Sequence, residues 1–226
     1  MTTLQERLEH VRRDLPAGVE LVAVSKFHPA QAVADAFEAG QRIFGESHVQ
    51  ELRQKYDVLP KEIQWHFIGH LQTNKVKYIA PFISLIHSVD SPALLREIDK
   101  QARRVGRRIP CLLELHVAAE ESKFGFTPDA CRDLLREGEW KAMEGVEIAG
   151  LMCMAPNTDD ADRIRSDFHT ARTLFDELKA DYFADSPAFC QRSWGMSHDY
   201  PLAIEEGATL VRIGTAIFGE RDYSQK

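Results

Sequence analysis

The sequence predicts an α/β protein, a (β/α)8 TIM barrel in a single domain with an extra helix at its N-terminus. Eight short apolar runs alternate with segments of helical periodicity. Most runs are apolar throughout, as is typical of parallel strands that are buried on both faces. The 226 residues, 44% of them hydrophobic, suffice for one large core and are few for two domains, so we expect residues 1–226 to form one domain. The alternative, an open doubly wound sheet, requires a topological switch point that no segment marks.

The chain begins with an amphipathic segment, residues 2–15, in which Leu4, Leu8, Val11 and Leu15 share one helical face. Strands are then expected at residues 20–25, 42–45, 64–69, 85–88, 111–117, 147–152, 189–197 and 209–213. The helices expected between them cover residues 29–39, 49–56, 73–79, 92–105, 128–137, 159–179 and 200–206, and a last short helix follows residue 216.

Several helix boundaries carry typical capping residues. Pro92 and Pro128 each follow a serine or threonine, which places a capping residue before a proline in the first helical turn. Gly40, Gly106 and Gly207 stand where helices are expected to end.

Charge and composition narrow the class of partner. The net charge of −7 disfavours nucleic acid, because a phosphate backbone attracts a basic surface. We interpret the one basic cluster as a solvated helix end, where cations suit the helix dipole. This cluster consists of Arg103, Arg104, Arg107 and Arg108.

The sequence carries no predicted export or membrane signal. The N-terminal segment MTTLQERLEHVRRDL is charged throughout, and no apolar run approaches the length of a membrane span. The 4 cysteines are widely spaced, form no CxxC pair and lie mostly in apolar runs expected to be buried strands, which is typical of reduced core thiols. We expect a cytoplasmic protein without a membrane partner. A lone barrel with polar helix faces is expected to be a monomer.

In a (β/α)8 barrel, functional residues gather at the C-terminal ends of the strands. The segments that follow the expected strands are rich in polar side chains. In strand order these ends carry Lys26; Glu46, Ser47 and His48; His70, Gln72 and Asn74; His87, Ser88 and Asp90; Lys123; Met152 and Met154; Met196, Ser197, His198 and Asp199; and Arg212, Gly214 and Thr215.

The residues at these strand ends give little support for a metal site or for a known nucleophile or nucleotide-binding motif. His66 and His70 are four residues apart, which on a strand separates them by about 13 Å, too far to share one metal ion. Ser25, Ser88 and Ser197 all lie outside a GxSxG motif, and the sequence contains no P-loop and no GxGxxG. We therefore expect no metal site.

Lys26 is a stronger signal. A lysine at the mouth of an apolar barrel loses hydration, which favours the neutral amine, and a neutral amine attacks carbonyl groups. A lysine that extends outward to water is the alternative interpretation.

The segment RIGTAIFG places Gly214 directly after the last strand and Thr215 at the start of a helical turn. Backbone N–H groups exposed in this way bind phosphate, and the loops after strands 7 and 8 form the usual phosphate site of these barrels. Ser197 adds a hydroxyl. A simple glycine-containing turn is the alternative. An aldehyde for Lys26 and a phosphate for this loop together suit pyridoxal 5′-phosphate (PLP), and equally a sugar phosphate handled by a Schiff-base aldolase.

Longer motifs narrow this choice. AVSKFHP, FGESHVQEL, WHFIGHLQTNK, IHSVDS, EESKFGF, GLMCM and GMSHDYPLAIEEGATLVRIGTAIFG occur in this order. Over residues 21–223 the sequence closely resembles the pyridoxal phosphate homeostasis proteins, a single-domain group related to the N-terminal barrel of alanine racemase. It departs from that family at Ser47, where asparagine is usual, and at Phe27, where threonine is common.

The resemblance implies PLP as cofactor, held as a Schiff base on Lys26. It implies that Arg212 faces the pyridine nitrogen. It also implies further cofactor contacts, with the phosphate or beside the ring, from Ser47, His70, Met196, Ser197, Gly214 and Thr215.

Arg212, in the position that the resemblance implies, is expected to weaken catalysis by the cofactor. Arginine stays protonated, so it discourages protonation of the pyridine nitrogen and weakens the cofactor as an electron sink. In the related racemases a second base, a tyrosine, comes from a separate domain, and a chain that ends at Lys226 has no room for it. We therefore expect a PLP-binding protein of vitamin B6 homeostasis without strong enzymatic activity, with apo forms of PLP-dependent enzymes as candidate recipients. The alternative is an amino-acid racemase or similar enzyme of narrow specificity, with His70, His87 and His198 as acid–base groups.

Overall fold

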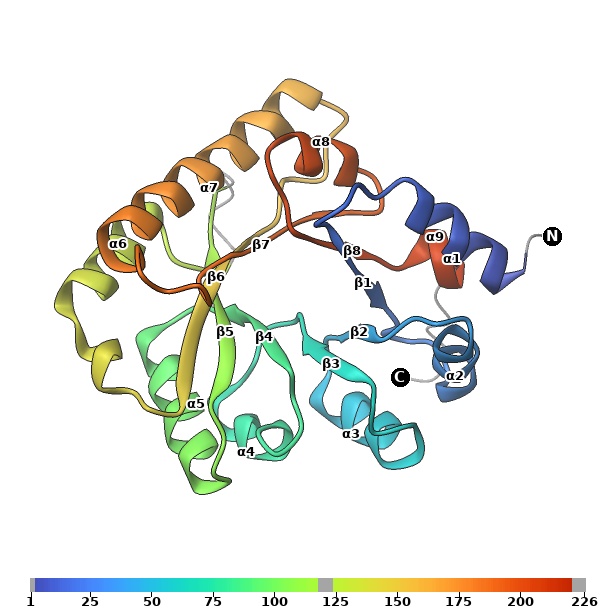
Figure 1. The fold of residues 1–226 in the computed structure, drawn as a ribbon, viewed down its shortest axis with the longest axis horizontal. Coiled ribbons are helices and arrows are strands. Elements are labelled where there is room, and N and C mark those ends of the chain that lie inside the picture. Colours follow the sequence, from blue (N-terminus) through green and yellow to red (C-terminus); the bar gives the residue numbers. More distant parts are fainter. Residues whose placement is uncertain (1–2, 118–123, 221–226) are drawn as a thin grey trace.

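In a computed structural model of the chain, which describes residues 3–117 and 124–220, eight parallel strands close into a barrel (Figure 1). Each strand pairs with the next along the chain, and the last pairs with the first, from Glu20 opposite Leu210 to Ala23 opposite Ile213. The predicted (β/α)8 barrel is confirmed, and the open doubly wound sheet is excluded.

All eight strands lie within two residues of their predicted ends. They are β1 (Glu20–Val24), β2 (Ile43–Glu46), β3 (Gln64–Phe67), β4 (Leu85–Val89), β5 (Ile109–Leu115), β6 (Val146–Cys153), β7 (Gln191–Met196) and β8 (Leu210–Ile213). The helices are α1 (Leu4–Arg13), α2 (Ala30–Glu38), α3 (Val49–Val58), α4 (Val76–Ile79), α5 (Pro92–Arg104), α6 (Pro128–Glu137), α7 (Ala161–Tyr182), α8 (Tyr200–Glu205) and α9 (Thr215–Phe218), with short 3-10 helices at Thr73–Lys75 and Glu139–Ala142.

The predicted N-terminal helix is α1, which lies on the outside of the barrel beside α9 (Figure 1). It begins with a capping box, in which Thr3 and Glu6 each accept the other's backbone N–H. Its apolar face buries Leu8 and Val11. The side chain of Arg7 donates a hydrogen bond to the carbonyl of Ile217 at 2.7 Å, so α1 is tied to the helix that follows β8.

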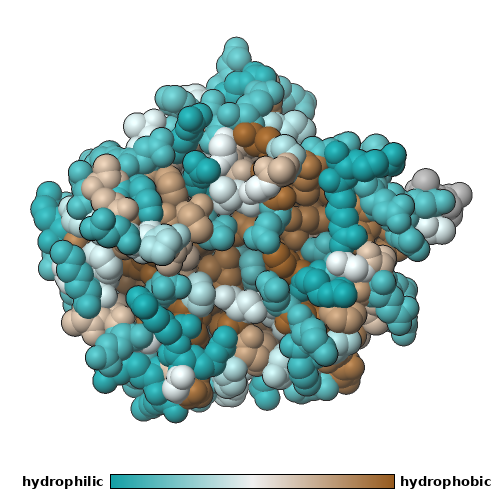
Figure 2. Space-filling view, viewed as in Figure 1, coloured by the Kyte–Doolittle hydropathy of each residue, from teal (hydrophilic) through white to brown (hydrophobic). Residues whose placement is uncertain are grey.

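The core has two parts. A small apolar cluster lies in the interior of the barrel, and a larger apolar cluster lies between the strands and the helices. In the view of Figure 2, hydrophilic side chains cover most of the outer helices and hydrophobic ones show between them. The interior cluster consists of Val22, Ile43, Leu85, Leu112, Ala149, Met152 and Leu210.

Three expectations need correction or lie outside the described residues. Cys190, expected in a buried strand, is exposed, because β7 begins one residue later, whereas Cys131 is buried within α6. Arg107 is not part of a solvated helix end: it is half-buried and donates to the carbonyls of Ala80 and Ile83. Residues 120–123 of the EESKFGF motif, including Lys123, are outside the described part of the chain.

Among the helices that are described, none has the length and apolarity to cross a membrane.

Candidate functional site

Lys26 lies in a tight turn at the mouth of the barrel, directly after β1, and is half-buried. The next residue, Phe27, has a φ of 64°, and it is the one non-glycine residue with a positive φ among those described. A left-handed conformation costs an ordinary residue about 1–2 kcal/mol. Here the backbone N–H of Phe27 donates to Oε1 of Glu51 at 2.7 Å, and the N–H of His28 donates to the carbonyl of Ser25 at 3.1 Å. The turn that carries Lys26 is therefore held in a specific, strained shape.

The loops after β7 and β8 come together beside this turn. The backbone N–H of Gly214 donates to Oγ of Ser197 over 3.4 Å, which is long and weak for such a bond. Gly214 packs so closely on the end of β1 that a Cβ atom on it would lie 3.0 Å from the carbonyl oxygen of Val24. Thr215 begins α9 and is exposed. Ser197, Gly214 and Thr215 are the residues expected to bind phosphate and are called the phosphate cluster below. The cluster meets the end of β1 through Gly214, which packs on Val24, two residues before Lys26 in the chain.

Arg212 lies inside the barrel below the mouth. It lies two residues after Leu210, on the same inward side of β8, and is buried. Its guanidinium donates to the carbonyl of Ser193 at 2.7 Å, to the Oγ of Ser193 at 2.5 Å and to the carbonyl of Cys153 at 3.0 Å. β6 and β7 therefore fix the position of this cation. Burial lowers the pKa of Arg212, with the nearby acidic groups Asp199 and Glu114 acting in the opposite direction.

Further polar side chains form a layer with Arg212. His87 lies 2.8 Å from Oγ of Ser193 through Nδ1 and 3.0 Å from Nδ1 of His66 through Nε2. Burial lowers the pKa of His66 to about 3 and that of His87 well below its usual value, the latter also through His66 and Arg212. Burial and Asp90 raise the pKa of Glu114 to about 7, while Arg212 opposes this. Burial thus favours the neutral form of both histidines, and the charged side chain beside them among the described residues is Arg212.

His70 and Ser47 lie on the rim. Nδ1 of His70 is 2.8 Å from Oδ2 of Asp90, and the ring of Phe124 stacks on the imidazole with 3.9 Å between centroids. Asp90 orients the ring and leaves Nε2 as the nitrogen available to a ligand. Ser47 Oγ instead contacts Nδ1 of His48 at 3.1 Å. The expected contacts of Ser47 and His70 with a cofactor stay predictions.

Met196 ends β7 and is half-buried. Its backbone N–H donates to Oδ1 of Asp199 at 2.5 Å, and this carboxylate is buried. Asp199 thereby fixes the loop that carries Ser197. The other rim histidine, His198, is exposed and lies 3.4 Å from Asp199.

His66 pairs with His87 inside the barrel rather than with His70 on the rim. The described residues contain no group of three or more His, Cys, Asp or Glu side chains placed to hold a metal ion.

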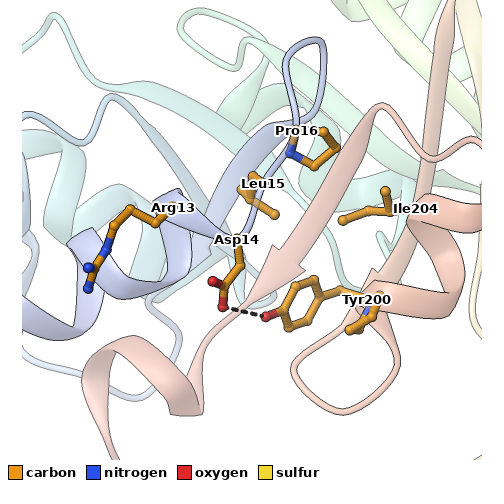
Figure 3. A pocket seen from close by; sticks show the side chains of 7 residues that line it. Arg13, Asp14, Leu15, Pro16, Tyr200 and Ile204 are labelled. Carbon is orange, nitrogen blue, oxygen red and sulfur yellow. Dashed lines mark hydrogen bonds between the residues drawn. The ribbon is translucent and has the colours of Figure 1, made fainter.

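A separate hollow opens on the outside of the barrel, between the end of α1 and α8 (Figure 3). Across it, the hydroxyl of Tyr200 donates to Oδ2 of Asp14 at 3.3 Å. None of the residues predicted to bind a cofactor lines this hollow, which therefore supplies no part of the candidate site. Its lining consists of Arg13, Asp14, Leu15, Pro16, Tyr200, Pro201 and Ile204.

Within the described residues, the mouth thus offers the amine of Lys26, the hydroxyl of Ser197 beside the backbone N–H of Gly214, and the buried cation of Arg212 beneath. The close approach of Gly214 to the end of β1 is possible because no Cβ is present there: a Cβ would meet the carbonyl oxygen and side chain of Val24. This donor set fits a phosphorylated aromatic aldehyde.

The acidic and basic side chains behind the Lys26 turn, Glu51 and Lys55, were not singled out from the sequence, although their i, i+4 spacing on one helix is visible there.

Comparison with known proteins defines the class first. The family described as alanine racemase, N-terminal domain, matches residues 1–222. Solved alanine racemases share this fold: one from Clostridium difficile superposes with a TM-score of 0.75 at 16% identity, covering 98% of this chain and 56% of that one. The closed barrel with a lysine after its first strand is therefore a racemase-type barrel.

Nearer relatives specify the family. A pyridoxal phosphate homeostasis protein of Aquifex aeolicus is 40% identical over 205 residues, which are 90% of this chain and 88% of the relative. The human protein of that name is 38% identical over 236 residues, covering 99% of this chain and 84% of the relative. The chain belongs to the pyridoxal phosphate homeostasis protein family. The structure of PipY from Synechococcus elongatus with PLP bound superposes with a TM-score of 0.86 at 39% identity, covering 96% of this chain and 100% of PipY.

Proposed function

We propose that this protein binds PLP reversibly, as a Schiff base on Lys26, and acts in vitamin B6 homeostasis without strong enzymatic activity. The observation that carries the proposal is the packing of Gly214 against the end of β1, which puts the phosphate cluster beside the turn of Lys26. The name of the family and the PLP-bound state of PipY support the same ligand.

When bound, PLP supplies an aldehyde carbon that a lysine amine attacks. In the proposed site, Lys26 provides this amine, and Ser197, Gly214 and Thr215 bind the phosphate. Met196, Ser47 and His70 line the mouth around the ring. Arg212, fixed by two strands, faces the ring nitrogen from below.

Arg212 argues for a carrier rather than a vigorous enzyme. A buried guanidinium held by three hydrogen bonds stays protonated, so towards the ring nitrogen it can act only as a hydrogen-bond donor, and its position is fixed. It keeps the facing nitrogen unprotonated, so the ring accepts electrons poorly. Loss of the aldehyde to free amines in the cell is prevented while Lys26 holds it.

At the level of the cell, the proposal places the protein in the cytoplasm as a monomer, with residues 1–226 acting as a single PLP-binding domain. Apo forms of PLP-dependent enzymes are the proposed recipients of the cofactor. The acidic net charge of −7 supports neither nucleic acid nor an anionic membrane surface as a partner.

One observation favours a second candidate function, that of an amino-acid racemase of narrow specificity. His70 on the rim is oriented by Asp90 at 2.8 Å, an arrangement suited to a general base. Exchange of the α-proton is the step that such a base would perform.

Two assays on the same PLP-loaded protein test the proposal. In the first, it is mixed with an apo-aminotransferase, and recovery of aminotransferase activity is compared with that given by Lys26→Ala treated in the same way. In the second, it is incubated with a panel of amino acids in deuterated water. We expect transfer of PLP from the wild type alone, and no α-proton exchange. Steady exchange that Lys26→Ala abolishes would favour the racemase instead.

A further inference from the structure

A buried group of charges lies directly behind the turn of Lys26, between β2 and α3. At its centre is Lys55, which is only 4% exposed. Its Nζ donates to the carbonyl of Ser25 at 2.8 Å, to Oε1 of Glu46 at 2.7 Å and to Oε1 of Glu51 at 2.8 Å. All three ammonium protons are thereby used. We call Ser25, Glu46, Glu51 and Lys55 the Lys55 cluster.

Each acceptor of Lys55 also contacts the turn. Ser25 precedes Lys26, and its hydroxyl donates to Oε1 of Glu46 at 2.7 Å. Phe27 follows Lys26, and its N–H donates to Oε1 of Glu51 at 2.7 Å. The ammonium of Lys55 therefore links the residues on both sides of Lys26, including the one in the left-handed conformation.

This cluster is costly for the fold, so stability alone does not account for it. Glu46 is fully buried, and within the described residues its Oε2 makes no hydrogen bond. Burial raises the pKa of Glu46 to about 7, with Lys55 and Ser25 acting against that rise. Apolar side chains of similar volume often stabilise a fold as well as a buried ion pair does, so what this cluster adds is the fixed geometry of its hydrogen bonds.

The Lys26 amine needs a defined position relative to the phosphate cluster if it is to reach the aldehyde of a bound PLP. The bond from the N–H of Phe27 to Glu51 favours the left-handed conformation at Phe27, so losing it would favour this strained turn, and hence the present position of Lys26, less. The phosphate cluster is fixed independently by β8 and by Asp199. A relaxed turn would move the amine with respect to an anchored phosphate.

We propose that Lys55 is a positioning residue for Lys26: its contacts with Glu46, Glu51 and Ser25 fix the turn in the shape that lets the Lys26 amine reach the aldehyde of a phosphate-anchored PLP. This inference rests on the proposed function, because it concerns the same site.

The test compares PLP binding to apoprotein for the wild type, Lys55→Met and the matched control Lys100→Met. Lys100 is exposed on α5 and pairs only with Glu97 at 3.4 Å among the described residues. Binding is followed by visible absorbance, and the modified peptide is mapped after borohydride reduction. We expect the dissociation constant for Lys55→Met to rise roughly ten- to a hundredfold, and that for Lys100→Met to stay at the wild-type value.

A milder pair keeps the test decisive if Lys55→Met does not fold. Glu51 is partly exposed, and Glu51→Gln retains a carbonyl acceptor for the N–H of Phe27, whereas Glu51→Ala does not. We expect Glu51→Ala to weaken PLP binding about tenfold, and Glu51→Gln, which loses the same charge but keeps the acceptor, to restore most of the affinity.

The outcomes separate the two proposals. If the wild type forms no reducible adduct, the proposed function fails and takes this inference with it. If the wild type forms the adduct while Lys55→Met or Glu51→Ala binds PLP with unchanged affinity, only the positioning role of Lys55 is overturned.

Discussion

Nη1 of Arg212 donates to the Oγ of Ser193 at 2.5 Å, and this bond sets the direction of a hydrogen-bond chain across the barrel. The Ser193 hydroxyl has one proton, and its one acceptor among the described residues is Nδ1 of His87, at 2.8 Å. Nε2 of His87 then carries the ring proton and donates to Nδ1 of His66 at 3.0 Å. The chain runs from the cation outward, with both histidines neutral.

This direction predicts the tautomers. Both His66 and His87 are expected to hold their proton on Nε2, because each accepts at Nδ1. Nitrogen-15 NMR of labelled protein at neutral pH measures this directly. A proton on Nδ1 of His87 would mean that Ser193 does not donate to it. Ser193→Ala should leave Nδ1 of His87 without its donor and change the nitrogen-15 chemical shift of that atom. The exposed control Ser166→Ala should change the nitrogen-15 shifts of neither His66 nor His87.

Ser197→Ala tests the phosphate cluster. The one hydrogen bond that the Ser197 side chain makes to the described protein is the weak bond from Gly214 at 3.4 Å, so its loss should not alter the melting temperature. Loss of a hydroxyl that binds phosphate should raise the PLP dissociation constant about tenfold, the equivalent of a charge-assisted hydrogen bond. Equilibrium titration by absorbance provides the measurement. An unchanged dissociation constant would place the phosphate elsewhere.

Glu114 should make stability depend on pH. Its pKa is raised from 4.5 to about 7, chiefly by burial, so folding favours its protonated form. The contribution of the protonated carboxyl to the free energy of unfolding is fully present below the pKa of Glu114 in the unfolded chain. It is lost as the pH rises through the pKa of Glu114 in the folded protein. Replacing the ionised carboxylate by an amide removes the loss. Glu114→Gln should therefore gain stability over the wild type between about pH 5 and about pH 8, by at most a few kcal/mol, since one pKa unit equals about 1.4 kcal/mol.

Urea unfolding at the two pH values measures this difference. The exposed control Glu62→Gln should show the same stability relative to the wild type at both. A gain from Glu114→Gln that shrinks as the pH rises would reverse the predicted sign and show that Glu114 is stabilised as a carboxylate, by Arg212.

Much of this architecture was predictable from sequence, for identifiable reasons. The strands are short apolar runs with little alternation, such as Leu21 to Val24, and that pattern is typical of a parallel sheet covered on both faces. Lys26 was conspicuous because a charge ends such a run. Gly214 was conspicuous because a glycine directly follows the last strand. Barrel closure then brings these two segments together, since β8 pairs with β1.

The supporting residues were less visible. Lys55 and Glu51 resemble an ordinary surface ion pair on α3, and only the packing of that helix on β2 shows that Lys55 is buried. The positive φ of Phe27 could not be predicted, because no glycine or asparagine marks the position. Cys190 was misplaced because strand ends are set by pairing with neighbours rather than by the apolar run alone.

Whether Lys26 holds PLP can be measured on the protein itself. Intact mass and visible absorbance are recorded for the protein with added PLP, before and after borohydride reduction, for the wild type and Lys26→Ala. We expect a yellow wild-type species that reduction fixes to the peptide containing Lys26, and no such species in the variant. Absence of an adduct on the wild type, or its presence on Lys26→Ala, would show that Lys26 does not hold PLP, and the former would favour a cofactor-free Schiff-base aldolase.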